Sequence, residues 1–205
     1  MDSLFEGYRR FRETYYRENE KLLKDLFNRG QAPKAMLIAC ADSRIEPALQ
    51  LGAKPGDMFV VRNVANLVPP YQPDEDFHGT SAALEFAVKV LKVEHIIVLG
   101  HARCGGVQAL LNGPVAGQTD FVNAWMRIAE PARKAVEAAN PPNADQRQLL
   151  AELESVKVSL ANLRTFPWVQ AAEQAGKVSL HGWYFNVGTG LLWRQDKDGV
   201  FKPVT

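Results

Sequence analysis

The chain alternates short strand-like runs with longer segments in which apolar residues recur every three or four positions. The runs cover residues 35–40, 57–62 and 94–100, and the first and third are nearly all apolar. Such runs are typical of strands buried on both faces of a parallel sheet. Helical spacing follows in residues 80–91 and 105–111. This alternation predicts an α/β fold: a mostly parallel central sheet flanked by helices, with right-handed crossovers.

The two ends of the chain have a different pattern. Residues 3–27 are charged, with apolar positions at helical spacing, and predict one or two amphipathic helices that end before Gly30 and Pro33. Residues 119–176 are helical, with breaks at Pro131, 140–143 and 165–167, and two strands follow at 177–187 and 191–194. We predict a single domain over residues 1–205, made of three parts. These parts are a helical arm (1–30), an α/β core (35–112) and a helical part with C-terminal strands (119–205).

Charge and composition exclude several classes of protein. Lys and Arg number 24 against 23 Asp and Glu, and no basic tract stands out, so nucleic acid is not an expected partner. No apolar stretch approaches the ~20 residues that span a bilayer, so no membrane association is expected. The first six residues do not resemble a signal peptide, and a cytoplasmic location is expected. Only two cysteines are present, too few for a disulfide scaffold.

Both cysteines and one histidine fall where strands end. Cys40 is the last residue of the first strand, His101 follows the third, and Cys104 comes three residues later. Ligands of open α/β sheets bind beyond these carboxyl ends, and thiolates and imidazole are natural ligands of Zn²⁺. Three protein ligands leave a tetrahedral position open, which predicts one catalytic Zn²⁺ per chain. A helix that starts at Gly105 is expected to lower the pKa of the Cys104 thiol.

A carboxylate and a guanidinium lie next to the first of these cysteines. Asp42 and Arg44 follow Cys40 at intervals of two residues. The two side chains can pair through two parallel hydrogen bonds. The pairing would keep Asp42 ionised and leave one of its oxygens free to accept a hydrogen bond from hydroxide at the metal. We therefore predict that Asp42 and Arg44 act as a pair in catalysis.

These motifs resemble one known family. C-A-D-S-R at residues 40–44 and H-A-R-C-G-G at residues 101–106 are similar to the β-class carbonic anhydrases. The resemblance extends to residues 55–57, 59–70, 79–80 and 180–183 and covers most of the chain. It implies reversible hydration of carbon dioxide to bicarbonate and a proton by a zinc-bound hydroxide. It also implies Cys40, His101 and Cys104 as zinc ligands, with Asp42 and Arg44 as the orienting pair.

The resemblance further implies a substrate pocket and an assembly. Gly105 would offer its backbone N–H to a substrate oxygen, and Gln31, nine residues before Cys40, would donate a hydrogen bond. Apolar pocket positions are matched by Phe59, Val64 and Phe86. Gln31, together with Leu37 where some members carry tryptophan, points to the plant-like, glutamine-containing branch. Members form homodimers with the active site at the interface, reached by the N-terminal helix, and dimers can pair into tetramers or octamers.

Two alternatives remain open at this stage. Relatives that hydrolyse carbonyl sulfide or carbon disulfide keep the same ligands and the same Asp–Arg pair. The second alternative is a non-enzymatic protein, either a zinc-stabilised interaction module or a redox sensor that uses the thiols of Cys40 and Cys104. A structural zinc site would require a fourth protein ligand, for which the spare histidines are His78, His95 and His181.

Overall fold

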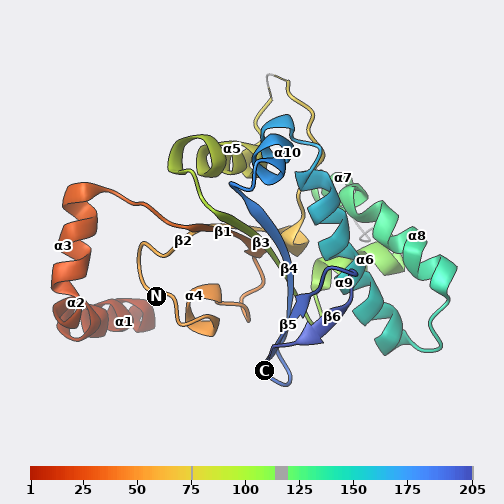
Figure 1. Ribbon diagram of the computed structural model, residues 1–205. Coiled ribbons are helices and arrows are strands. Elements are labelled where there is room, and N and C mark those ends of the chain that lie inside the picture. Colours follow the sequence, from red (N-terminus) through yellow and green to blue (C-terminus); the bar gives the residue numbers. More distant parts are fainter. Residues whose placement is uncertain (75, 114–119, 205) are drawn as a thin grey trace.

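A six-stranded sheet forms the centre of the computed structural model, which describes residues 1–74, 76–113 and 120–204 (Figure 1). The strand order is β2-β1-β3-β4-β5-β6. The strands are β1 (Ala35–Cys40), β2 (Met58–Asn63), β3 (His95–His101), β4 (Ser179–Asn186), β5 (Leu191–Gln195) and β6 (Phe201–Pro203). Strands β1 to β4 run parallel to one another, whereas β5 pairs antiparallel with β4 and β6 antiparallel with β5. The predicted fold class is confirmed, and β6 is the strand that the pattern missed because it is only three residues long.

The order of the strands brings the predicted metal ligands together. Strand β1 pairs in parallel with β3, and Ala39 lies opposite Leu99. Cys40 at the end of β1 and His101 at the end of β3 therefore leave the sheet at the same edge. Because β1 and β3 are neighbours, Cys40 can reach the same metal ion as His101 and Cys104.

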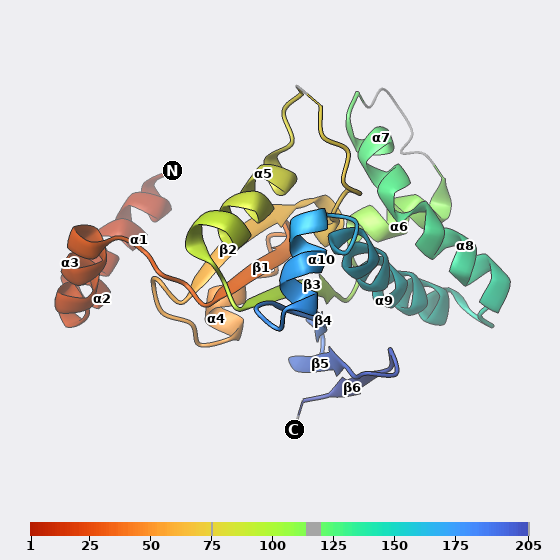
Figure 2. The same cartoon turned by 45° about the horizontal axis from the view of Figure 1, so that its top comes forward.

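Helices cover the sheet and extend beyond it (Figure 2). The main ones are α1 (Asp2–Glu13), α2 (Tyr15–Glu18), α3 (Glu20–Arg29), α4 (Pro47–Gln50), α5 (Gly79–Glu85), α6 (Gly105–Asn112), α7 (Val122–Met126), α8 (Glu130–Ala139), α9 (Ala144–Leu163) and α10 (Pro167–Gln174). Short turns are η1 (Val64–Asn66), η2 (Phe86–Leu91) and η3 (Arg127–Ala129). Residues of α5, α9 and α10 pack with Met36, Ile38, Ile96 and Val98 of the sheet to form the largest core cluster.

The N-terminal arm differs from the prediction in its number of helices. It has three helical segments rather than one or two, with breaks at Thr14 and Asn19. The hydroxyl of Thr14 and the amide of Asn19 each donate to the carbonyl four residues earlier, Arg10 and Tyr15. Such side-chain bonds compete with regular helical bonding and favour a bend. No residue of the three segments is buried, and the arm projects to one side of the sheet (Figure 1).

The predicted helical part is present with one change at Pro131. This proline stands in the first turn of α8 and begins the helix rather than breaking it, as its missing N–H allows. The predicted boundaries Thr119 and Thr205 lie outside the described residues. No helix in the described part of the chain is both long and apolar enough to cross a bilayer.

Candidate metal centre

Cys40, His101 and Cys104 converge at the carboxyl edge of the sheet. Their ligand atoms all lie within 4.8 Å of one another, and each residue is at most 6% exposed. The two sulfurs are 4.0 Å apart. Two thiolates bound to one tetrahedral zinc at ~2.3 Å would stand roughly 3.8 Å apart. The spacing therefore suits one shared ion, whereas a disulfide would need a sulfur separation near ~2.05 Å.

The imidazole of His101 is oriented for metal binding. Its Nδ1 lies 3.0 Å from the carbonyl oxygen of Ala102. A carbonyl only accepts, so Nδ1 carries the proton and Nε2 presents its lone pair. Nε2 is buried and has no hydrogen-bond partner among the described residues. A buried imidazole nitrogen without a partner, facing two thiols, fits a zinc ligand whose other nitrogen is fixed by the backbone.

The electrostatics of the cluster favour a thiolate without any metal. The hydrogen bond from Cys104 lowers the pKa of Cys40, and the same contact raises the pKa of Cys104. Backbone N–H groups of α6 work to lower the pKa of Cys104, as predicted, but Cys40 and burial outweigh them. Burial works to lower the pKa of His101, yet the interaction with Cys40 makes the net shift upward. A divalent cation would replace the protons of the cluster and would allow both thiols to be ionised, because its charge offsets the repulsion between the two thiolates.

Asp42 and Arg44 form the predicted pair beside the cluster. Arg44 donates from Nε to Oδ1 (2.9 Å) and from Nη2 to Oδ2 (2.7 Å), and its backbone N–H also donates to Oδ1 (2.9 Å). These bonds, with the side-chain contact the largest cause, hold the pKa of Asp42 well below its usual range. Both oxygens thus contact Arg44, contrary to the expectation that one would be free. Oδ2 accepts a single bond among the described residues and keeps a lone pair for a further donor.

Two further arginines fix the loops that carry the ligands. Arg62 at the end of β2 donates to the carbonyls of Cys40 (3.0 Å), Asp42 (2.8 Å) and Ile45 (2.6 Å). This role could not be predicted from the sequence, because it depends on three carbonyls some twenty residues away. Arg103, directly before the ligand Cys104, has a left-handed backbone (φ 57°). Its carbonyl accepts from Arg44 (2.9 Å), while its side chain reaches outward to Asp145 (3.0 Å).

Of the predicted pocket residues, Val64 and Gly105 lie at the cluster. Gly105 directly follows Cys104 and begins α6. A Cβ at the next residue, Gly106, would meet Val64 Cγ1 at 3.0 Å. Val64 therefore packs against residues 101–106, which carry His101 and Cys104 and are called the ligand loop below. Val64 also lines a cavity of about 650 Å³ and is 40% exposed. Trp125, which closes one side of this cavity, donates from Nε1 to the carbonyl of Val64 (2.7 Å).

The other three predicted pocket residues lie away from the cluster of the same chain. Phe59 pairs with Met36, four positions before Cys40, which places it roughly 13 Å back along the strand at ~3.3 Å per residue. Phe86 packs against Phe59 with ring centroids 5.8 Å apart and is 41% exposed. Gln31 is exposed and precedes β1. One chain therefore assembles the metal ligands and the Asp–Arg pair but not the complete predicted pocket.

The spare histidines do not join the cluster. His95 begins β3 at the opposite edge of the sheet, and its Nδ1 lies 3.2 Å from Nε2 of His181. His78 is exposed and pairs with Asp74 (2.6 Å). Within residues 1–74, 76–113 and 120–204, the cluster thus has three protein ligands, and the fourth tetrahedral position is open to a small molecule.

Comparison with known sequences identifies the family. The carbonic anhydrase family profile matches residues 35–192. The chain is 41% identical over 190 residues to a chloroplastic β carbonic anhydrase of Arabidopsis thaliana, covering 91% of this chain and 62% of that protein. It is 40% identical over 193 residues to a carbonic anhydrase of Pseudomonas aeruginosa, covering 94% and 86%. The chain therefore spans less than two thirds of the length of the plant relative.

Solved structures agree with the sequence comparison. The β-carbonic anhydrase CcaA superposes with a TM-score of 0.93 at 32% identity, over 100% of this chain and 92% of that one. A tetrameric β-carbonic anhydrase from Sordaria macrospora gives a TM-score of 0.83 at 29% identity, over 94% and 95%. With its Cys-His-Cys cluster at the edge of a parallel sheet, this chain belongs to the β-class carbonic anhydrases, the family that interconverts carbon dioxide and bicarbonate.

Proposed function

We propose that this chain hydrates carbon dioxide to bicarbonate and a proton at a Zn²⁺ held by Cys40, His101 and Cys104. The observation that carries the proposal is the buried three-ligand cluster, with one coordination position left and Asp42 directly beside it. Zinc in such a site lowers the pKa of bound water toward ~7 and so supplies a nucleophile at neutral pH. Membership of the family supports the same reaction.

The residues around the cluster would divide the remaining work. Asp42, held ionised by Arg44, would accept a hydrogen bond through Oδ2 and so orient the attacking water toward the substrate carbon. The backbone N–H of Gly105, at the start of α6, donates to a substrate oxygen. Val64 supplies an apolar wall that suits an uncharged gas and disfavours the product anion.

A second copy of the chain would complete the pocket. Gln31, Phe59 and Phe86 lie on the arm side of the sheet, too far along β1 to reach the cluster of their own chain. The arm also leaves large apolar side chains in solvent, among them Leu4 (68% exposed), Phe5 (53%) and Tyr8 (58%). A dimer in which each arm lies on its partner would bury these residues and bring the three pocket residues to the partner's cluster. The Sordaria relative is described as tetrameric, so pairs of dimers are a further expectation.

We also assign the chain to the plant-like branch with an open site. Gln31 is present, and Leu37 stands where some members carry tryptophan. Asp42 is engaged by three hydrogen bonds from Arg44, which favours the paired carboxylate over a carboxylate bound to the metal.

Stopped-flow measurement of carbon dioxide hydration with a pH indicator tests the reaction. We expect fast hydration by the zinc-loaded protein, loss of hydration and of bound zinc in His101→Ala, and full activity in His181→Ala. His181→Ala is the matched control because it removes a histidine on the same sheet but outside the cluster. A zinc-loaded protein without hydration activity would contradict the proposal, and carbonyl sulfide and carbon disulfide would be the next substrates to assay.

Mixing two inactive variants tests the shared site. Cys104→Ala removes a metal ligand, and Gln31→Ala removes a residue expected to act on the partner's site. In a random mixture half of the dimers contain one chain of each kind, and each mixed dimer has one intact site, so about a quarter of the wild-type activity should return. If each chain uses its own Gln31, the mixture should be only half as active as Gln31→Ala alone at the same total protein concentration. That result would contradict the shared site.

A further inference from the structure

We propose that Glu152 on α9 is a positioning residue that holds the Cys104 ligand in place for zinc. The proposal rests on the zinc site of the proposed function, and it adds a residue from a part of the chain that carries none of the family motifs noted above. Glu152 lies 48 residues beyond Cys104 in the sequence.

The first observation is a carboxylate buried against the ligand loop. Glu152 is 3% exposed. Its Oε1 accepts from the backbone N–H of Cys104 (3.0 Å) and from Nε2 of Gln148 (2.6 Å), and its Oε2 accepts from the hydroxyl of Tyr184 (2.8 Å). An ionisable group is seldom buried this deeply without a specific partner, because desolvation of the charged form is costly. Here its hydrogen-bonded partners are all donors, which is the arrangement that a carboxylate needs.

The second observation is that side chains of α9 form hydrogen bonds with both peptide groups of Cys104. Gln148, one turn before Glu152, donates from Nε2 to the carbonyl of Cys104 (3.2 Å) as well as to Glu152. The N–H on one side of Cys104 and the carbonyl on the other are therefore both tied to α9. Two such contacts fix the direction of the Cα–Cβ bond and so the place of the sulfur.

The packing of the sheet brings α9 close enough for these contacts. A Cβ at Gly100, directly before His101, would lie 2.7 Å from Val156 Cγ2, and one at Gly182 would lie 3.1 Å from Val156 Cγ1. Val156 stands one turn after Glu152 on α9. The two glycines thus allow α9 to rest on β3 and β4, with Glu152 at the level of the ligand loop. Burial, reinforced by Glu152, raises the pKa of Tyr184, which keeps its hydroxyl a donor.

The consequence is that the third ligand depends on the core of the protein and not only on its own loop. Partners that orient a metal ligand typically change metal affinity by ~10–100-fold when they are removed. We expect an effect of this size for Glu152 on the retention of zinc, at a site that Glu152 itself does not touch.

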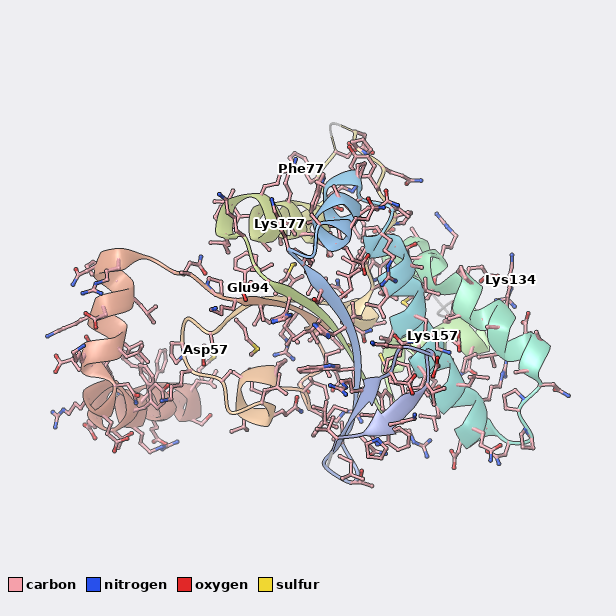
Figure 3. All side chains as sticks on the ribbon, in the orientation of Figure 1. Asp57, Phe77, Glu94, Lys134, Lys157 and Lys177 are labelled. Carbon is pink, nitrogen blue, oxygen red and sulfur yellow. The ribbon has the colours of Figure 1, made fainter. Side chains whose placement is uncertain are left out.

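The test compares Glu152→Gln with Glu154→Gln on the same helix. Glu154 is the matched control because its carboxylate pairs with Lys157 (2.6 Å), which is labelled in Figure 3, instead of with Cys104. Zinc release is followed with a chromogenic chelator, and the Co²⁺-substituted proteins are compared through their thiolate-to-cobalt absorption. We expect ~10–100-fold faster release and an altered cobalt spectrum in Glu152→Gln, with Glu154→Gln unchanged.

Zinc release from Glu152→Gln at the wild-type rate, with an unchanged cobalt spectrum, would overturn the proposal. If Glu152→Gln does not fold, Tyr184→Phe serves instead, because it removes only the donor to Oε2 and should release zinc up to ~10-fold faster. Wild-type release from Tyr184→Phe would then count against the proposal. Zinc release is measured without the carbon dioxide reaction. A protein that binds zinc but does not hydrate carbon dioxide would contradict the proposed function, and the zinc release rates of the variants could still be compared.

Discussion

Gly100→Ala is the substitution for which the structure gives the sharpest expectation. Gly100 is buried between β4 and α9, directly before the ligand His101. A new Cβ would lie 2.7 Å from Val156 Cγ2, with the carbonyl oxygens of Glu152 and Trp183 each 3.7 Å away. The backbone therefore limits any retreat of the Cβ, and a valine in a helix has one strongly preferred rotamer, so its side chain cannot easily turn aside.

The size of the effect follows from two opposing contributions. Overpacking a core by a methyl group destabilises a protein by ~1–3 kcal/mol, and so close a contact belongs in the upper half of that range. Replacing glycine by alanine in a strand returns ~0.5–1 kcal/mol. We expect a net loss of about 1–2 kcal/mol in the free energy of unfolding. In a domain of this length that corresponds to a Tm lower by ~2–8 °C.

Chemical denaturation of matched variants provides the assay. Gly79→Ala is the control, because a Cβ there has no neighbour within 4 Å, and it should be neutral or slightly stabilising. The double variant Gly100→Ala/Val156→Ala should lose less stability than the sum of its single variants, since Val156→Ala removes the clashing methyl. A Gly100→Ala protein as stable as the wild type, or more stable, would refute the reasoning.

Three further predictions concern the metal centre and its surroundings. Arg44→Ala should reduce hydration activity and raise the pKa of Asp42. Because the Asp42–Arg44 pair depresses this pKa, its contribution to stability is present above ~pH 4 and lost at lower pH. The free energy of unfolding should thus fall more steeply between pH 5 and 2 in the wild type than in Arg44→Ala, and equal slopes in urea titrations would contradict the lowered pKa of Asp42. Trp125→Phe removes the hydrogen bond to the carbonyl of Val64 (2.7 Å) and should lower the free energy of unfolding by ~0.5–1.5 kcal/mol. An unchanged free energy of unfolding would contradict a contribution of this bond to stability. Removing zinc with a chelator should lower Tm by several degrees, since a ligand at ~100 times its Kd contributes ~2.7 kcal/mol, and a Tm independent of the chelator would argue against a metal site.

Local patterns were enough to predict most of the fold. Strand β1 was predicted residue for residue, and β2 and β3 within one residue. Strands β1 and β3 are buried along almost their whole length, and such strands are continuous apolar runs. Helix α4 and turn η1 were not predicted, because they are only four and three residues long. Three other features also escaped prediction. Strand β6 is too short for a pattern, the bends at Thr14 and Asn19 come from polar side chains and not from glycine or proline, and the π-helical turn η2 continues α5 without a change in periodicity.

Two short motifs were enough to predict the chemistry of this protein. Each motif lies at the end of a predicted strand, so both the residue types and their place at the carboxyl edge of the sheet could be predicted. Together the motifs contain Cys40, Asp42, Arg44, His101 and Cys104. In contrast, the residues that hold the ligands in place, and the pocket residues that one chain can bring to them, depend on the tertiary structure. The contact of Glu152 with Cys104 depends on how closely α9 rests on the sheet, and the distance of Phe59 from the cluster depends on strand register. Both are relations between residues far apart in the chain, set by packing, which no local pattern of hydrophobic and polar positions encodes.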